Sequence, residues 1–235
     1  WMLRLAGMDV QTIPGGYKTH RKLVQASFKQ NYQLKVLGGQ TGSDKTAVLA
    51  AMRKLGAQVL DLEALASHRG SAFGGLGMKG QPGVEHFENE LHHQLIRLNP
   101  DKDIWLEDES RKIGTVIIHA DFWEQKDKAV LFYLDVPLEN RIQRIREDYA
   151  HFGPEALGNA AKKIGKRLGP QHLKEALLAL EEGDIDHFIR KVLVYYDNTY
   201  NWSLQRRQGK EIHQINCANQ TIDEIAHQLI DFKLT

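Results

Sequence analysis

The pattern of hydrophobic and polar positions changes near residue 33. From there on, short apolar runs alternate with longer segments of helical periodicity, which is typical of a parallel sheet covered by helices on both faces. The predicted strands span residues 34–37, 58–62, 104–106, 129–136 and 211–216, with a further short segment at 115–118. We therefore expect an α/β fold, similar to that of P-loop NTPases, with a mostly parallel sheet.

Helical periodicity without strands extends over residues 138–204, which predicts a helical insertion or lid over the sheet. The closing helix is expected over residues 221–232, because Thr221 followed three residues later by Glu224 matches a capping box. Three elements are predicted before the sheet: a helix end at residues 1–7, a short strand at 10–13 and a basic linker helix at 17–30.

The first predicted strand leads into a glycine-rich loop, which precedes a helix. The loop consists of Gly38, Gly39, Gln40, Thr41, Gly42, Ser43, Asp44, Lys45 and Thr46. This order matches a phosphate-binding P-loop, in which backbone N–H groups and a helix N-terminus bind an anion. Lys45 is expected to contact a terminal phosphate, and Thr46 to ligate Mg²⁺ if that ion is used. Asp44 stands where the motif has glycine, and its carboxylate would repel phosphate unless it points away.

Residues that follow the strands are expected to converge on this loop, because ligands of open α/β sheets bind beyond the carboxyl ends of the strands. Arg69 and Ser71 lie in a glycine-rich loop that could bind an anion, and Arg111 follows the third strand. Lys45, Arg69 and Arg111 are the candidates for a catalytic role. The candidate acids for holding metal-bound water are Asp61, Glu63, Glu107 and Asp108. A flexible surface loop and solvated strand-end acids are the alternative interpretations.

Basic and aromatic side chains occur together in the second half of the chain. The candidates for RNA contacts are Lys162, Lys163, Lys166, Arg167, Tyr195, Tyr196, Arg206 and Arg207. Cations that bind phosphates and aromatic rings that stack on unpaired bases are typical of single-stranded RNA recognition, although tyrosines at helical spacing usually pack. His86, Glu90 and His93 share one helical face, but such residues usually face solvent, so no metal site is expected there.

Composition excludes few functions. The 31 Lys and Arg residues nearly balance the 30 Asp and Glu residues of the 235-residue chain, so nucleic-acid binding does not follow from net charge. The single cysteine, Cys217, excludes an intrachain disulfide and is typical of a reducing cytosol, so we expect a cytoplasmic protein. No apolar run reaches the length of a membrane span, and no membrane partner is expected.

Four segments resemble the tRNA 2-selenouridine synthase family, and the resemblance extends over residues 10–235. They are GGQTGSDKT at 38–46, QVLDLEALASHRGSAFGGLG at 58–77, WLEDESRKIG at 105–114 and FYLDVPLENRIQRIREDY at 132–149. Members of that family carry a rhodanese domain before the P-loop domain. The resemblance implies a rhodanese remnant and linker at residues 1–30 and a P-loop α/β domain at 31–235. It places the rhodanese cysteine upstream of Trp1, so we expect this fragment alone to lack the selenium-transfer step.

The resemblance implies a transferase that acts on the wobble 2-thiouridine of tRNA. Geranyl diphosphate would alkylate the sulfur, and selenophosphate would then replace the geranylthio group with selenium. The implied partners are tRNA, these small phosphorylated substrates and the rhodanese domain. An apolar trough for the prenyl chain is expected near Phe73, Phe122 and Trp123. The alternatives are an ATP-dependent small-molecule kinase and a non-catalytic fragment that binds tRNA or prenyl diphosphate.

Overall fold

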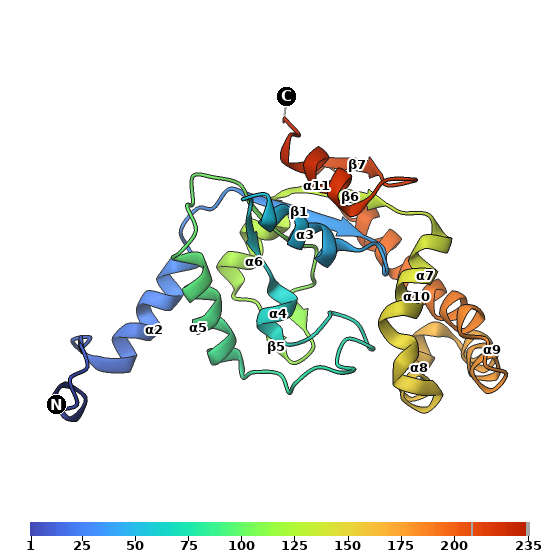
Figure 1. The fold of residues 1–235 in the computed structure, drawn as a ribbon, viewed down its shortest axis with the longest axis horizontal. Coiled ribbons are helices and arrows are strands. Elements are labelled where there is room, and N and C mark those ends of the chain that lie inside the picture. Colours follow the sequence, from blue (N-terminus) through green and yellow to red (C-terminus); the bar gives the residue numbers. More distant parts are fainter. Residues whose placement is uncertain (208, 234–235) are drawn as a thin grey trace.

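The structure, a computed structural model, describes residues 1–207 and 209–233 and contains a five-stranded sheet at its centre (Figure 1). Every neighbouring pair of strands in this sheet is parallel, and the strand order is β2-β3-β1-β6-β7. The strands are β1 (Leu34–Gly39), β2 (Gln58–Leu60), β3 (Ile104–Glu107), β6 (Val130–Asp135) and β7 (Ile212–Asn216). The predicted α/β class with a mostly parallel sheet is confirmed.

Both faces of the sheet are buried over β1, β2, β3 and β6, because successive residues of these strands point into different cores, whereas the edge strand β7 contributes Ile215 to one core. Val36 of β1 belongs to the core under one face, and the next residue, Leu37, belongs to the core under the other. The first face is covered by α2 (Gly16–Ser27), α4 (Leu62–Ala66), α5 (Val84–Leu95) and α6 (Ala120–Lys128). The second face is covered by α3 (Lys45–Lys54) and α11 (Ile222–Ile230), and the predicted capping box of Thr221 and Glu224 begins α11.

A helical layer with its own apolar core follows β6, as the periodicity over residues 138–204 predicts. It comprises α7 (Leu138–Tyr149), the 3₁₀ turn η1 (Ala150–Phe152), α8 (Gly153–Leu168), α9 (Pro170–Glu181) and α10 (Ile185–Gln205). In Figure 1 these helices lie beside the end of the sheet at which β1 leads into α3. The last helix, α10, returns to the sheet, where the Tyr200 hydroxyl accepts a hydrogen bond from the Gly39 N–H.

Three predicted strands differ in the structure. Residues 10–13 form no strand: the Val10 carbonyl accepts hydrogen bonds from the Arg4 side chain and no neighbouring strand pairs with this segment. The second strand ends at Leu60, because the Asp61 carboxylate accepts a hydrogen bond from the Ala64 N–H and thereby caps α4. The segment near residue 116 forms β5 (Val116–Ile117), which pairs with β4 (Lys112–Ile113) in a separate antiparallel hairpin.

The N-terminal residues differ in how they pack. Helix α1 (Met2–Leu5) matches the predicted helix end and buries none of its residues. Helix α2, in contrast, contributes Val24 to the core of the α/β domain, and Phe28 follows it there. The division of the chain at residue 30 stays a prediction.

Candidate phosphate and apolar site

The glycine-rich loop connects β1 to α3, as predicted, and lies where anions bind in α/β proteins. Strand β1 is central, and the strands that follow it are placed first on one side and then on the other, so this loop lies at the switch point of the sheet. A side chain at Gly38 would come within 2.4 Å of the Tyr200 hydroxyl, and Gly42 has a φ of +85°. Both positions therefore favour glycine.

The Lys45 ammonium lies over the loop that precedes it. Its Nζ donates a hydrogen bond to the Gly39 carbonyl at 2.9 Å and reaches the Gln40 carbonyl at 3.4 Å. Because carbonyls rather than a carboxylate hold Lys45, its positive charge is not neutralised. The neighbouring Thr46 lies in the first turn of α3, and its hydroxyl is 3.5 Å from the Glu63 carboxylate.

Asp44 adopts the left-handed conformation that the motif's glycine would take, with φ 56° and ψ 24°. Its carboxylate is directed at α7, where Oδ1 lies 2.7 Å from Arg144 Nε. Arg144 also pairs with Asp148 at 3.2 Å. Burial raises the pKa of Asp44, Arg144 lowers it, and the Asp148 carboxylate raises it again. The departure from the motif is thus compensated by an arginine of the helical layer.

The loop forms one wall of a cleft of about 670 Å³ between the sheet and the helical layer. The predicted site residues that line it are Gly39, Thr41, Gly42, Ser43, Asp44, Lys45, Thr46, Glu63, Arg69, Ser71, Asp108, Arg111, Tyr196, Arg206 and Arg207. The predicted residues outside its lining are Gly38, Gln40, Asp61, Glu107, Lys162, Lys163, Lys166, Arg167 and Tyr195. The predicted convergence on the P-loop is therefore observed for the segments that follow β2 and β3.

Four cations of this cleft form no ion pair with any described residue: Lys45, Arg69, Arg111 and Arg206. Arg69 lies over the Tyr149 ring at 5.5 Å, and the Arg111 Nε is 3.4 Å from the Ile118 carbonyl. The loop that carries Arg69 is anchored by the Tyr196 hydroxyl, which accepts a hydrogen bond from the Ala72 N–H. These charges give the cleft the capacity to bind a multiply charged anion.

Three glutamates near the phosphate loop, Glu63, Glu107 and Glu109, hold protons more tightly than usual. Burial raises the pKa of Glu107 to about 8, with Asp61 and Glu109 adding to the effect. Burial likewise raises the pKa values of Glu63 and Glu109, which lie beside each other, and Lys45 opposes both shifts. Glu63 and Glu109 line the cleft. Glu109 was not singled out from the sequence, although it completes the run of three acids after β3 that could have indicated it.

Asp108 has a different role from the one predicted. Its Oδ1 lies 2.5 Å from Arg207 Nη2 and 3.5 Å from Lys126 Nζ, and its Oδ2 accepts a hydrogen bond from Tyr200 at 3.1 Å. Because the Tyr200 hydroxyl also accepts a hydrogen bond from the Gly39 N–H, Asp108 connects α6 and the C-terminal end of α10 to the phosphate loop. Its carboxylate is used in these contacts rather than turned toward metal-bound water.

Asp61 and Glu107 are also placed differently from the prediction. Asp61 caps α4, and Glu107 is 1% exposed with its Oε2 accepting a hydrogen bond from the Leu62 N–H at 3.3 Å. Neither lines the cleft. Of the four predicted acids, only Glu63 remains in a position to hold metal-bound water.

The RNA candidates separate into two groups. Lys162, Lys163, Lys166 and Arg167 are exposed on α8, outside the cleft, and Arg167 contacts the Tyr195 hydroxyl at 3.3 Å. Arg207 is 8% exposed and pairs with Asp108, and Tyr196 packs against the helical core, so neither presents the exposed surface that was predicted. Exposed Arg206 remains at the cleft.

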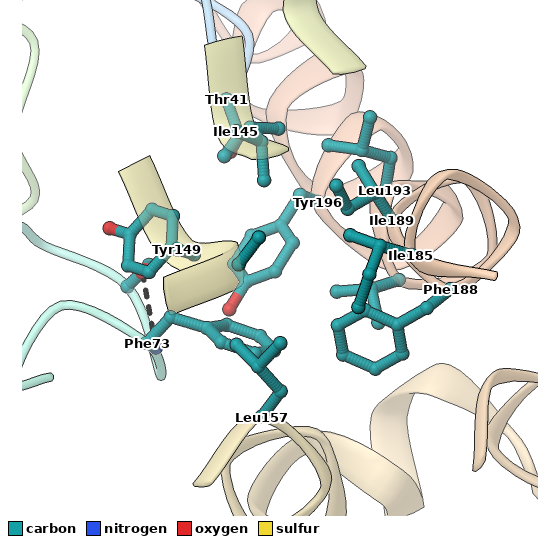
Figure 2. Close-up of a pocket in the computed structure, with 13 residues that line it drawn as sticks. Thr41, Phe73, Ile145, Tyr149, Leu157, Ile185, Phe188, Ile189, Leu193 and Tyr196 are labelled. Carbon is teal, nitrogen blue, oxygen red and sulfur yellow. Dashed lines mark hydrogen bonds between the residues drawn. The ribbon is translucent and has the colours of Figure 1, made fainter. Parts of the chain in front are cut away.

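An apolar cavity of about 40 Å³ adjoins the cleft (Figure 2). Five residues line both spaces: Thr41, Ser71, Ile145, Tyr149 and Tyr196. The other residues around the cavity are Phe73, Ala150, Leu157, Ile185, Phe188, Ile189, Val192 and Leu193. Of the predicted trough, Phe73 lies here, whereas Phe122 is fully buried under the sheet and Trp123 lines the polar cleft.

Other reactive groups do not extend this site. Residues 1–207 and 209–233 contain no cluster of three or more His, Cys, Asp or Glu side chains arranged to hold a metal ion. Cys217 directly follows β7 and is buried in the core that the sheet forms with α3 and α11. Burial raises the pKa of its thiol to about 11. None of the described helices combines the length and apolar character that crossing a bilayer requires.

Comparison with known proteins identifies the family. Residues 32–179 match the family described as the tRNA 2-selenouridine synthase AAA domain. The chain belongs to the tRNA 2-selenouridine synthase family. The tRNA 2-selenouridine synthase of Nitrosomonas eutropha is 32% identical over 88% of this chain, and the one of Pseudomonas fluorescens is 34% identical over 88%. The chain spans 66% and 65% of those two relatives' lengths.

A third relative, the tRNA 2-selenouridine synthase of Shewanella loihica, is 31% identical over 94% of this chain and 68% of its own length. A solved structure, TT1252 from Thermus thermophilus, matches 86% of this chain and 97% of its own with a TM-score of 0.33 and 16% identity. A likeness of that size is too weak to bear on fold or function.

Proposed function

We propose that this domain holds a prenyl diphosphate during modification of tRNA by a member of the tRNA 2-selenouridine synthase family. The substrate class is geranyl diphosphate, and the acceptor is the sulfur of wobble 2-thiouridine. Selenophosphate would use the same phosphate loop when selenium replaces the geranylthio group. The family membership supports the tRNA substrate, and the two adjoining spaces support the prenyl diphosphate.

One observation carries this proposal: the cationic cleft and the apolar cavity share a wall. Thr41 of the phosphate loop and Ile145 of α7 line both. A ligand with a diphosphate at one end and a hydrocarbon chain at the other matches this arrangement. The cavity has room for roughly three water-sized groups, so the first carbons of the chain fit and the rest requires the helical layer to open.

Alkylation needs a stabilised leaving group. The sulfur forms a bond to the first prenyl carbon, the bond from that carbon to the diphosphate breaks, and the negative charge gathers on the departing diphosphate. Lys45, Arg69 and Arg111 line the cleft, and together with the loop N–H groups they would bind that charge. The uridine gives up its N3 proton in the same step. Glu109 at the cleft wall is a suitable acceptor, because Lys45 and the hydrogen bond from Glu63 favour its ionised form and oppose the effect of burial on its pKa.

The donors beside the loop also fit Mg²⁺. The Thr46 hydroxyl and the Glu63 carboxylate are 3.5 Å apart, and Mg²⁺ uses few protein oxygens together with phosphate and water. A bound Mg²⁺ would neutralise charge on the diphosphate. Thr46 and Glu63 would hold it, with no ligand supplied by Asp108.

The proposal is tested by calorimetric titration with geranyl diphosphate, inorganic pyrophosphate and ATP, each with and without Mg²⁺. We expect geranyl diphosphate to bind more tightly than pyrophosphate, because the apolar surface of its geranyl group is removed from water when it binds. Lys45→Ala is expected to weaken both at least about tenfold, in line with the strength of charge-assisted hydrogen bonds. Preference for ATP would favour the kinase alternative instead.

A matched pair of variants distinguishes binding of the prenyl group from binding of the diphosphate. Val192→Phe adds volume to the cavity wall, whereas Leu178→Phe adds the same kind of side chain to the exposed surface of α9. Only the first is expected to weaken geranyl diphosphate binding, and neither should change pyrophosphate binding. Equal geranyl diphosphate affinity in Val192→Phe and wild type would remove the cavity from the proposal.

A further inference from the structure

Trp202 differs from the other aromatic residues of the cleft. It lies near the end of α10, lines the cleft and keeps 57% of its surface exposed. Tyr149, Tyr196 and Tyr200 line the same cleft, but burial raises the pKa of each, and their rings pack against other aromatic residues. Trp123 also lines the cleft, but it is half-buried and its ring lies against buried Lys126. Trp202 therefore presents an exposed aromatic face to the cleft, which the packed tyrosines do not.

Arg206 lies one helical turn after Trp202 and stacks on it. The guanidinium carbon is 4.6 Å from the centre of the indole ring, and Arg206 is one of the four cleft cations that pair with no carboxylate of the described chain. Stacking holds the guanidinium flat against the ring and leaves its N–H groups available at the edge. The pair therefore presents a flat apolar surface beside a positive charge.

The cleft is larger than the diphosphate end of a prenyl substrate requires. Its volume of about 670 Å³ extends from Lys45 to Trp202 and Arg206. Ligand pockets for whole small molecules have volumes of roughly 300–1,000 Å³, so a diphosphate leaves room for a further group of nucleoside size. The prenyl chain is not a candidate for Trp202, because the apolar cavity is lined by the N-terminal part of α10, from Ile185 to Tyr196, and does not include Trp202.

We propose that Trp202 and Arg206 form a stacking platform for an unpaired base of the RNA substrate, at the rim of the cleft whose wall is the phosphate loop. Aromatic stacking together with a cation for the backbone phosphate is the chemistry that binds bases of single-stranded RNA. This inference rests on the proposed function, in which the acceptor is a nucleotide of tRNA. It assigns that nucleotide, or its direct neighbour, to the side of the cleft formed by the C-terminal end of α10.

A flat ring with a cation could also bind a protein side chain, and the charge of the cleft argues against that occupant. Arg69, Arg111 and Arg206 face the same space, and Lys210 at its edge is already paired with Asp127. These three arginines form no ion pair with described residues, and an RNA strand supplies both phosphates for them and bases for the aromatic ring.

The test measures the affinity of the whole 235-residue protein and its variants for a synthetic anticodon stem-loop RNA with 2-thiouridine at the wobble position. The control RNA is a fully paired hairpin of the same length and charge. Trp202→Phe keeps an aromatic face, and Trp202→Leu keeps apolar area without one. We expect Trp202→Leu to bind the stem-loop about five- to a hundredfold more weakly, as loss of one stacked base implies, with Trp202→Phe in between and the paired hairpin unaffected.

Tryptophan emission gives an independent measurement. Stacking on a base should quench the wild-type emission as the stem-loop is added, and Trp202→Phe should lose that quenching although it still binds. Pyrophosphate titration of Trp202→Leu is expected to match wild type, which shows that the phosphate loop is intact. The inference would be overturned if wild type, Trp202→Phe and Trp202→Leu showed the same stem-loop affinity and the same quenching. It would also be overturned if both variants lost the same amount of affinity, because an aromatic face would then make no difference. Failure of wild type to bind the stem-loop would instead overturn the RNA part of the proposed function.

Discussion

Asp44 Oδ1 and Arg144 Nε form an ion pair of 2.7 Å between the phosphate loop and the first helix of the helical layer. The pair turns the Asp44 carboxylate toward α7 and brings an arginine to the edge of the cleft. We expect a phosphate in the cleft to compete with Asp44 for Arg144. An aspartate at the motif's glycine position should therefore lower the anion affinity of the loop.

Asp44→Asn is expected to tighten pyrophosphate binding about three- to tenfold, because it removes one negative charge near the ligand and releases Arg144. Arg144→Gln should weaken binding by a similar factor. Isothermal titration at low and at high salt measures both effects, and high salt should reduce them. Arg146→Gln is the control, since Arg146 pairs with Asp186 outside the cleft. Weaker binding by Asp44→Asn would contradict the competition.

The exposed cations of α8 are tested by charge reversal. Lys163→Glu combined with Arg167→Glu is expected to weaken tRNA binding and to reduce the slope of log affinity against log salt by about one to two, because phosphate contacts release counterions. Filter binding over a range of salt concentrations measures the slope. Reversal of Lys54 and Lys102, which are exposed at the other end of the strands, is the control. An unchanged slope would remove the α8 cluster from the tRNA surface.

Glu107 makes stability depend on pH. Its pKa is about 8 in the folded protein and about 4.3 in an unfolded chain, so the folded state binds the extra proton between these values. The free energy of unfolding that Glu107 contributes is therefore highest below about pH 4 and falls as pH rises toward 8. Glu107→Gln should flatten this dependence and raise the melting temperature at pH 9 by at least about 3 °C.

Thermal unfolding at pH 5, 7 and 9 measures the Glu107 effect. Glu124→Gln serves as its control, because Glu124 is on the surface and pairs with Lys128. Parallel curves for wild type and Glu107→Gln would mean that Glu107 is ionised in the folded protein.

Asp108→Asn is expected to lower the free energy of unfolding by about 3–5 kcal/mol, because it leaves buried Lys126 and Arg207 without their carboxylate. Urea unfolding measures the loss, and Glu139→Gln, which breaks an exposed pair with Arg190, should change little. Pyrophosphate affinity should fall as well, since Asp108 holds Tyr200 against Gly39. A variant as stable as wild type would show that the network contributes no stability.

Local sequence signals located the fold and the phosphate loop. The strand, the loop and the helix around Lys45 depend on neighbours in the chain, because glycine conformations and apolar periodicity are local properties. The same is true of the capping box at Thr221. The roles of Asp108 and Arg207 were not accessible in this way, since these residues are 99 positions apart and meet only through α10.

The sequence by itself determined the parallel α/β sheet, the helical layer over residues 138–204 and the position of the glycine-rich loop between β1 and α3. Only the tertiary structure decided which acids form buried contacts and which tyrosines pack in the core. It also decided that Arg144 pairs with the Asp44 carboxylate. The physical reason is that pairing and burial depend on distances between segments remote in the chain. Periodicity reports which face of an element is buried, but not which charge lies opposite it.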